Sequence, residues 1–273
     1  MIELKTISSM DELLKSLNEL PNNYIYRGHA DADWRLESTL ERVLGASLSN
    51  SDTNIYEDHY LNLFKSKYHI YNDNNHEPKS KLAWLSVMQH YGAPTRLIDF
   101  TESPYISLYF ALEAYNPQSK KDLAIYALDY SSIMDQSLEF ISQKDSSFKF
   151  KRLDIIGKQD HLFENVVDRF SYEVIWITEP LELNIRIDRQ AGTFLISGDR
   201  KKRIEDLLSS VLYKNTRMIK FKISYELYHS IYALLRKMNI NSKSIYGDLS
   251  GLAKSIKMDM QVHVVPQYIV DKT

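Results

Sequence analysis

The stretch APTRLIDFTESPYISLYFALEAY, residues 93–115, decides the fold of this chain. Residues 95–100, which include Leu97, Ile98 and Phe100, are predicted to be extended and have the length of a short strand. Ser103 and Pro104 then mark a helix start, because serine is a preferred N-cap and proline fits the first helical turn. We expect a helix from there to about Tyr115, so that a strand passes almost directly into an apolar helix.

The rest of the chain mixes strands and helices in the same way. Ser9 and Glu12 have the spacing of a capping box, which predicts a short helix that ends before Pro21. The polar, lysine-rich residues 131–160 are predicted to be an insertion or a mobile excursion. Periodicity predicts further helices at residues 37–44, 55–68 and 81–91, the last capped by Gly92, and strands at residues 24–27, 123–128, 174–177, 183–187, 192–196 and 218–223. The predicted fold class is α+β, with residues 1–273 as a single domain.

The composition excludes several classes of protein. The chain is 44% apolar and 26% charged, which is typical of a soluble globular protein. It has no cysteine, so disulfides, iron–sulfur clusters and thiolate zinc sites are excluded. Its 34 basic and 36 acidic residues nearly balance, so the chain as a whole lacks the net positive charge of a general nucleic-acid-binding protein. The sequence shows no signal peptide, membrane span, H-E-x-x-H or glycine-rich phosphate loop, and we expect a cytoplasmic protein without a catalytic metal or membrane association.

Arg27 and Gly28 lie at the end of the apolar strand that begins at Tyr24. An arginine at a strand end can direct its planar donors toward a phosphate or a carboxylate. The glycine after it lets a ligand approach the backbone closely. The alternative interpretation is a surface arginine beside a turn glycine.

A second cluster brings many functional groups into about fifteen residues around a strand and two helix ends. It contains an imidazole, a phenol, a guanidinium, two carboxylates and two hydroxyls, from His90, Tyr91, Arg96, Asp99, Glu102, Thr101 and Ser103. The second helix start favours an anion. The alternative is that the hydroxyls are helix caps and that Arg96 and Asp99 form a surface pair. Gln190 precedes Gly192 at a predicted turn into a strand. It is interpreted either as a further residue of the site or as a residue with a purely structural role.

Taken together, these segments resemble the FRG domain, a bacterial family named for an aromatic–Arg–Gly element. That element is Tyr26–Arg27–Gly28 here, and the family's pattern Q-H-Y-G-x-P-T-R-L-L-D-[WF]-T-x-S-P-x-x-A-L-Y-F-A is matched by residues 89–111, with Ile98 and Ser107 as departures. Later motifs are matched by Trp176, Glu179, Pro180, Arg186, Gln190, Gly192 and Phe194, and by residues 245–253.

The resemblance extends more weakly to the ADP-ribosyltransferase fold and implies a split sheet, mixed or antiparallel, flanked by helices. It implies that Arg27 holds the phosphates or the nicotinamide ribose of NAD, the substrate, without a metal. Gln190 would stand where a glutamate is usual, and His90 and Asp99 would orient groups or move protons. The remaining residues expected to bind NAD are Tyr26, Gly28, Tyr91, Arg96, Thr101, Ser103 and Tyr109.

The activity implied is transfer of ADP-ribose to a nucleic acid or protein in bacterial defence or toxin activity. Because Gln190 replaces the usual glutamate, a second interpretation is a non-enzymatic module that binds a nucleotide or phosphorylated ligand in the same cleft. A third is a metal-free nuclease or hydrolase that uses His90 and Asp99. The three differ in whether NAD binding, NAD turnover or nucleic-acid cleavage is expected.

Overall fold

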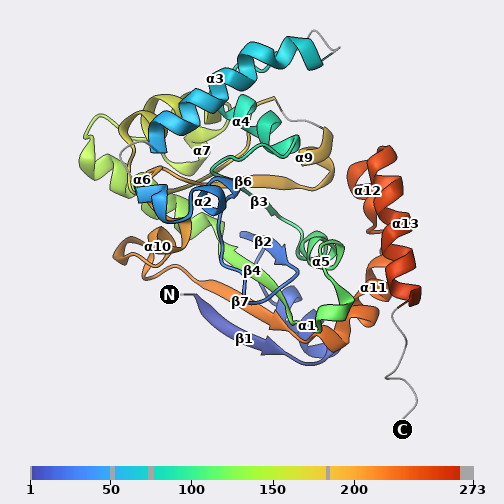
Figure 1. The fold of residues 1–273 in the computed structure, drawn as a ribbon. Coiled ribbons are helices and arrows are strands. Elements are labelled where there is room, and N and C mark those ends of the chain that lie inside the picture. The colour runs from blue at the N-terminus through green and yellow to red at the C-terminus, as the bar shows by residue number, and fades with distance from the viewer. Residues whose placement is uncertain (1, 50–52, 73–76, 183–184, 265–273) are drawn as a thin grey trace.

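The computed structural model describes residues 2–49, 53–72, 77–182 and 185–264, and its centre is a seven-stranded sheet (Figure 1). The strand order is β1-β7-β4-β2-β3-β6-β5. Strands β1 and β7 are parallel and the other neighbours are antiparallel, so the sheet is mixed. The strands are β1 Glu3–Ile7, β2 Tyr24–His29, β3 Leu97–Thr101, β4 Leu123–Asp129, β5 Ile175–Thr178, β6 Gly192–Ser197 and β7 Met218–Ile223.

The sheet is nearly divided between β2 and β3. Strand β2 pairs with β4 along its whole length, and β3 pairs with β6 along its whole length. Between β2 and β3, the register contains one pair, Tyr26 with Thr101. The two strands therefore diverge, and the groups beyond this pair do not continue the ladder.

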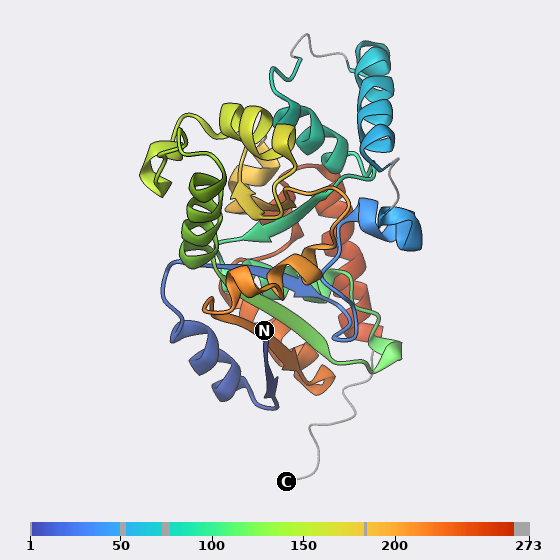
Figure 2. The same cartoon turned by 90° about the vertical axis from the view of Figure 1, so that its left-hand side faces the viewer.

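Helices cover both faces of the sheet and enclose a core on each (Figures 1 and 2). One core packs the sheet against α1 Met10–Asn18, α5 Pro104–Glu113, α11 Tyr228–Lys237, α12 Ser242–Tyr246 and α13 Leu249–Val264. The other packs it against α3 Thr53–Tyr71, α4 Lys81–His90, α6 Tyr130–Lys144, α7 Arg152–Ile155, α8 Gln159–Leu162, a π-helix at Phe163–Asp168, α9 Ile185–Arg189 and α10 Ile204–Leu208. Helix α2, Thr39–Leu44, lies beside α3 outside the sheet (Figure 2).

The predicted α+β class is confirmed, as is the helix start at Ser103 and Pro104. The Ser103 side chain accepts the Ile106 amide and caps α5. Gly92 follows α4 with φ +80°, in the left-handed region predicted for it. No helix in the described ranges combines the length and the apolar character needed to cross a membrane.

Two predictions of local structure are wrong. Residues 131–160 are not an excursion, because α6 buries Ile133, Met134 and Ile141 against the sheet and its neighbours. The strand predicted at residues 183–187 is helix α9 from Ile185 onward, and residues 183–184 lie outside the described residues. Alternation over so short a segment does not separate a strand from one helical turn, and either structure can bury Ile187, which is 8% exposed.

Candidate functional site

A cavity of about 580 Å³ lies where β2 and β3 diverge. This volume falls within the usual range for small-molecule sites. Strands β2 and β3, the segment before α2, helices α2, α5, α12 and α13, and the turn before β6 all contribute to its wall. The lining residues are Tyr26, Arg27, Gly28, His29, Ala30, Trp34, Arg35, Glu37, Arg42, Asp99, Phe100, Thr101, Phe110, Glu113, Ala114, Gln190, Tyr246 and Lys254.

Arg27 spans the division in the sheet with its side chain. Its Nη1 donates to the backbone carbonyl of Asp99 at 2.6 Å, and its Nε donates to Nε2 of His29 at 3.1 Å. The guanidinium is partly exposed and forms no ion pair with a carboxylate of the described residues. Burial of His29, with the positive charge of Arg27 beside it, lowers the pKa of His29 to about 3. His29 is therefore a neutral acceptor that fixes the orientation of Arg27.

Arg42 on α2 is a second guanidinium in the cavity wall, and sequence reasoning missed it. It is exposed, and its Nη1 donates to the carbonyl of Glu37 at 2.8 Å. Like Arg27, it lacks an ion pair within the described part of the chain. Burial lowers the pKa of Arg27, and the positive charge of Arg42 adds to this effect although Asp99 opposes it. The two arginines therefore create a site at which an anion is favoured.

Gly28 lies in the cavity wall, but the close approach that it permits is that of α5. A Cβ atom at this position would lie 1.9 Å from the carbonyl oxygen of Ser107 and 2.8 Å from the amide nitrogen of Ala111. The sequence interpretation gave this space to a ligand. The helix backbone fills it instead, so the glycine holds α5 against β2.

Thr101 and Gln190 connect the end of β3 to the turn before β6. The Thr101 hydroxyl donates to the Gln190 carbonyl at 2.7 Å and accepts the Ser103 amide at 3.1 Å. These bonds place the Gln190 side chain in the cavity. That side chain is 9% exposed, and its Nε2 has no hydrogen-bond partner in the described ranges. A buried amide donor without a partner is costly, and a ligand oxygen would satisfy it.

Asp99 is the exposed carboxylate at this end of the cavity. Gln89 donates to its Oδ2 from Nε2 at 3.0 Å. Asp99 and Gln190 also line a smaller hollow of about 40 Å³ together with His90. His90 therefore lies beside the main cavity rather than in its wall.

Glu113 on α5 is a further carboxylate of the cavity that the sequence did not indicate. It accepts hydrogen bonds from the hydroxyls of Tyr246 at 2.7 Å and Tyr109 at 2.8 Å, and it pairs with Lys254 at 3.1 Å. These contacts attach α12 and α13 to α5. The signal in the sequence that could have identified Glu113 as a site residue is its position just after the motif at residues 89–111.

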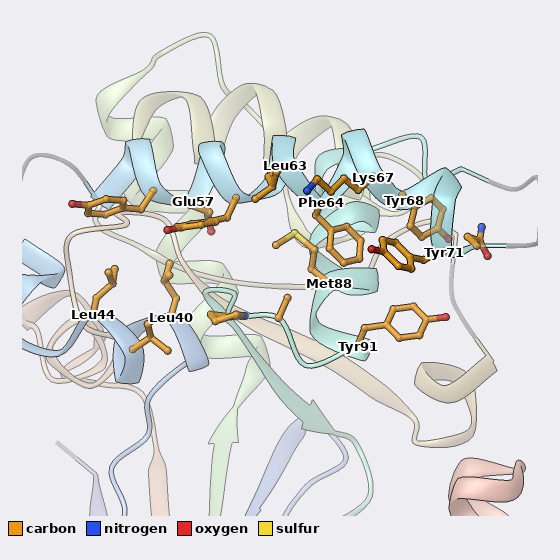
Figure 3. A pocket seen from close by; sticks show the side chains of 16 residues that line it. Leu40, Leu44, Glu57, Leu63, Phe64, Lys67, Tyr68, Tyr71, Met88 and Tyr91 are labelled. Carbon is orange, nitrogen blue, oxygen red and sulfur yellow. The ribbon is translucent and has the colours of Figure 1, made fainter.

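Three of the residues predicted to bind NAD lie outside the cavity wall in ordinary structural roles. Ser103 caps α5. Tyr109 is buried, donates its hydroxyl proton to Glu113 and accepts from the Ser242 hydroxyl at 2.7 Å. Tyr91 lines a separate, apolar cavity of about 620 Å³ between α2, α3 and α4, shown in Figure 3.

Arg96, also predicted to bind NAD, lies in a buried ion-pair network instead. Its side chain lies 3.1 Å from Glu57 and pairs with Asp168. Arg200 pairs with the same two carboxylates, at 3.1 Å and 2.7 Å. These partners come from α3, the π-helix and the segment after β6, so they could not be recognised as neighbours from sequence spacing. Arg96 joins these elements and does not reach the cavity.

The geometry defines an α+β protein with an arginine-lined cavity at a division in its sheet. Residues 22–120 match the family model of the FRG domain, and the chain therefore carries an FRG domain. Comparison with curated proteins and with solved structures finds no significant match. The matched range supplies most of the cavity wall, and Gln190, Tyr246 and Lys254 join it from later in the chain. No group of three or more potential metal ligands occurs within the described residues.

Proposed function

We propose that this cavity binds NAD and that the protein transfers ADP-ribose from NAD to a protein or nucleic acid. The observation that carries the proposal is the meeting of Arg27, Arg42 and Gln190 in one cavity. In the described ranges, neither guanidinium forms an ion pair with a carboxylate, and the Gln190 Nε2 has no hydrogen-bond partner. The two guanidiniums suit the diphosphate of a dinucleotide. The Gln190 amide suits a ribose hydroxyl or a carbonyl oxygen. Such a modification would also serve a defence or toxin role.

In the proposed reaction, the bond between nicotinamide nitrogen and ribose C1′ breaks and its electron pair leaves with neutral nicotinamide. A nucleophilic oxygen or nitrogen of the acceptor forms the new bond to C1′. The proton of this nucleophile passes to the carboxylate of Asp99, which is exposed and held by Gln89. Positive charge develops on the ribose in such a step, and the same carboxylate stabilises it.

Nicotinamide release from NAD, with and without added protein or single-stranded nucleic acid, tests this proposal. The informative variant is Gln190→Met, which keeps the volume of the side chain and removes the amide. Because Nε2 has no partner in the described residues, its loss should leave stability nearly unchanged. We expect at least tenfold slower release, with Gln143→Met, an exposed glutamine of α6, as the matched control. Absence of release from the wild type under all these conditions would reject transferase activity.

A binding module without turnover is the second candidate, and one observation favours it. The position before β6 holds Gln190 rather than a glutamate, and Glu37 and Glu113 in the same cavity are engaged by Arg203 and Lys254. This candidate predicts saturable binding of NAD or ADP-ribose with no nicotinamide released. Calorimetry combined with product analysis separates the two.

A further inference from the structure

The indole ring of Trp34 lies in the cavity wall and does not pack into either hydrophobic core. It is 50% exposed and lines the same cavity as Arg27 and Gln190. The other two tryptophans of the chain are buried, since Trp84 is 7% and Trp176 0% exposed. A large ring left half in water beside charged groups offers an apolar face to a ligand.

The main chain beneath this ring is fixed. The Trp34 carbonyl accepts from the Tyr126 hydroxyl at 3.2 Å and from the Lys220 ammonium at 3.4 Å. Its amide donates to the carbonyl of Asp31 at 3.2 Å. A ring on a fixed backbone loses little further freedom when a planar group stacks on it.

We infer that Trp34 forms the adenine subsite of the cavity, with the indole stacking on the base of the bound nucleotide. This inference rests on the proposed binding of NAD. In the proposed reaction, the bond that breaks lies beside Asp99 and Gln190, which line a smaller hollow together. The adenine base, at the other end of the dinucleotide, then stacks on Trp34, which is 50% exposed in the wall of the same cavity. Arg27 and Arg42, which line the same cavity, hold the phosphates that join the two ends.

Tryptophan fluorescence and calorimetry test the subsite without requiring turnover. Titration of the full-length protein with AMP or NAD should quench emission saturably, whereas nicotinamide mononucleotide, which lacks adenine, should not. In Trp34→Phe this quenching should disappear, because the remaining tryptophans are buried. Trp34→Ala should bind AMP about 5- to 150-fold more weakly, as expected for the loss of base–aromatic stacking. Tyr91→Ala, which removes an exposed aromatic residue outside this cavity, should bind as the wild type does.

The outcomes distinguish the subsite from the activity. If nicotinamide is released but Trp34→Ala binds AMP as tightly as the wild type, the subsite is overturned and the proposed function stands. If AMP quenches Trp34 and no nicotinamide is released, the subsite stands and transfer fails. Quenching that persists in Trp34→Phe, or a wild type that binds no adenine nucleotide, overturns the subsite.

Discussion

The Nη1 of Arg27 donates to the backbone carbonyl of Asp99 across the division between β2 and β3. This bond takes the place of a ladder hydrogen bond, because the two strands pair only at Tyr26 and Thr101. One side chain thus contacts both halves of the sheet and the cavity between them. A ligand that binds Arg27 therefore binds at the junction of the two halves.

Replacement of Gly28 by alanine should be strongly destabilising. The added Cβ would lie 1.9 Å from a backbone oxygen of α5, so the helix would have to move. We expect a loss of about 3 kcal/mol or more in the free energy of unfolding, measured by urea denaturation. Gly92→Ala is the control, because Gly92 has φ +80° but open space around it, and it should lose only about 1–2 kcal/mol. Equal losses would show that α5 does not constrain position 28.

Replacement of Arg96 by methionine should reduce stability without weakening ligand binding. The change removes one of the cations that neutralise the buried carboxylates of Glu57 and Asp168. Breaking a buried ion pair in this way should lower the free energy of unfolding by about 3–5 kcal/mol. Lys15→Met breaks the exposed pair with Glu19 and should cost less than about 1 kcal/mol. NAD affinity of the folded Arg96→Met protein should equal that of the wild type. A stable variant with weakened binding would instead identify Arg96 as a ligand contact.

The parts of the fold that local signals control could be predicted from the sequence. The Ser103–Pro104 cap fixes the start of α5, and the continuous apolar run of β4 fits a strand buried on both faces. Strand β1 could not be predicted, because Glu3–Ile7 is short and mostly exposed and its partner β7 begins at Met218. The error at α9 has the same cause, since only packing selects between a strand and a single helical turn there.

The site could be predicted where motif residues lie on neighbouring strands. Thr101 ends β3 and Gln190 precedes β6, whereas Arg27, predicted at a strand end, lies inside β2, which continues to His29. Arg27, Thr101 and Gln190 reach one cavity because β2, β3 and β6 are neighbours in the sheet. Arg42 belongs to a short helix whose placement depends on tertiary packing, so its approach to the cavity gives no local signal. Arg96 was misplaced because the carboxylates that surround it are distant in the sequence.

His29 should make stability depend on pH in a defined window. Its pKa is about 3 in the folded protein, against an ordinary value of 6.5, so the unfolded chain binds a proton between these values and the native protein does not. The contribution of neutral His29 to the free energy of unfolding is therefore full above pH 6.5 and is lost as the pH falls toward 3. In this window, the free energy of unfolding of His29→Gln should fall by up to about 1.4 kcal/mol less per pH unit than that of the wild type. The amide oxygen of the glutamine can still accept the hydrogen bond from Arg27.

Urea denaturation at pH 7, 6 and 5 measures this difference. His161→Gln, an exposed histidine on α8, is the matched control and should follow the wild-type profile. Parallel profiles for the wild type and His29→Gln would contradict a buried, neutral His29.

Calorimetric titration with NAD tests the central claim most directly, using the wild type, Arg42→Met and the control Arg169→Met. Arg42 lines the cavity, whereas Arg169 is exposed elsewhere. Loss of a hydrogen-bonded charge contact should weaken binding by about tenfold or more in Arg42→Met and leave Arg169→Met unchanged. Equal affinity in all three proteins, or no saturable heat with the wild type, would contradict NAD binding in this cavity.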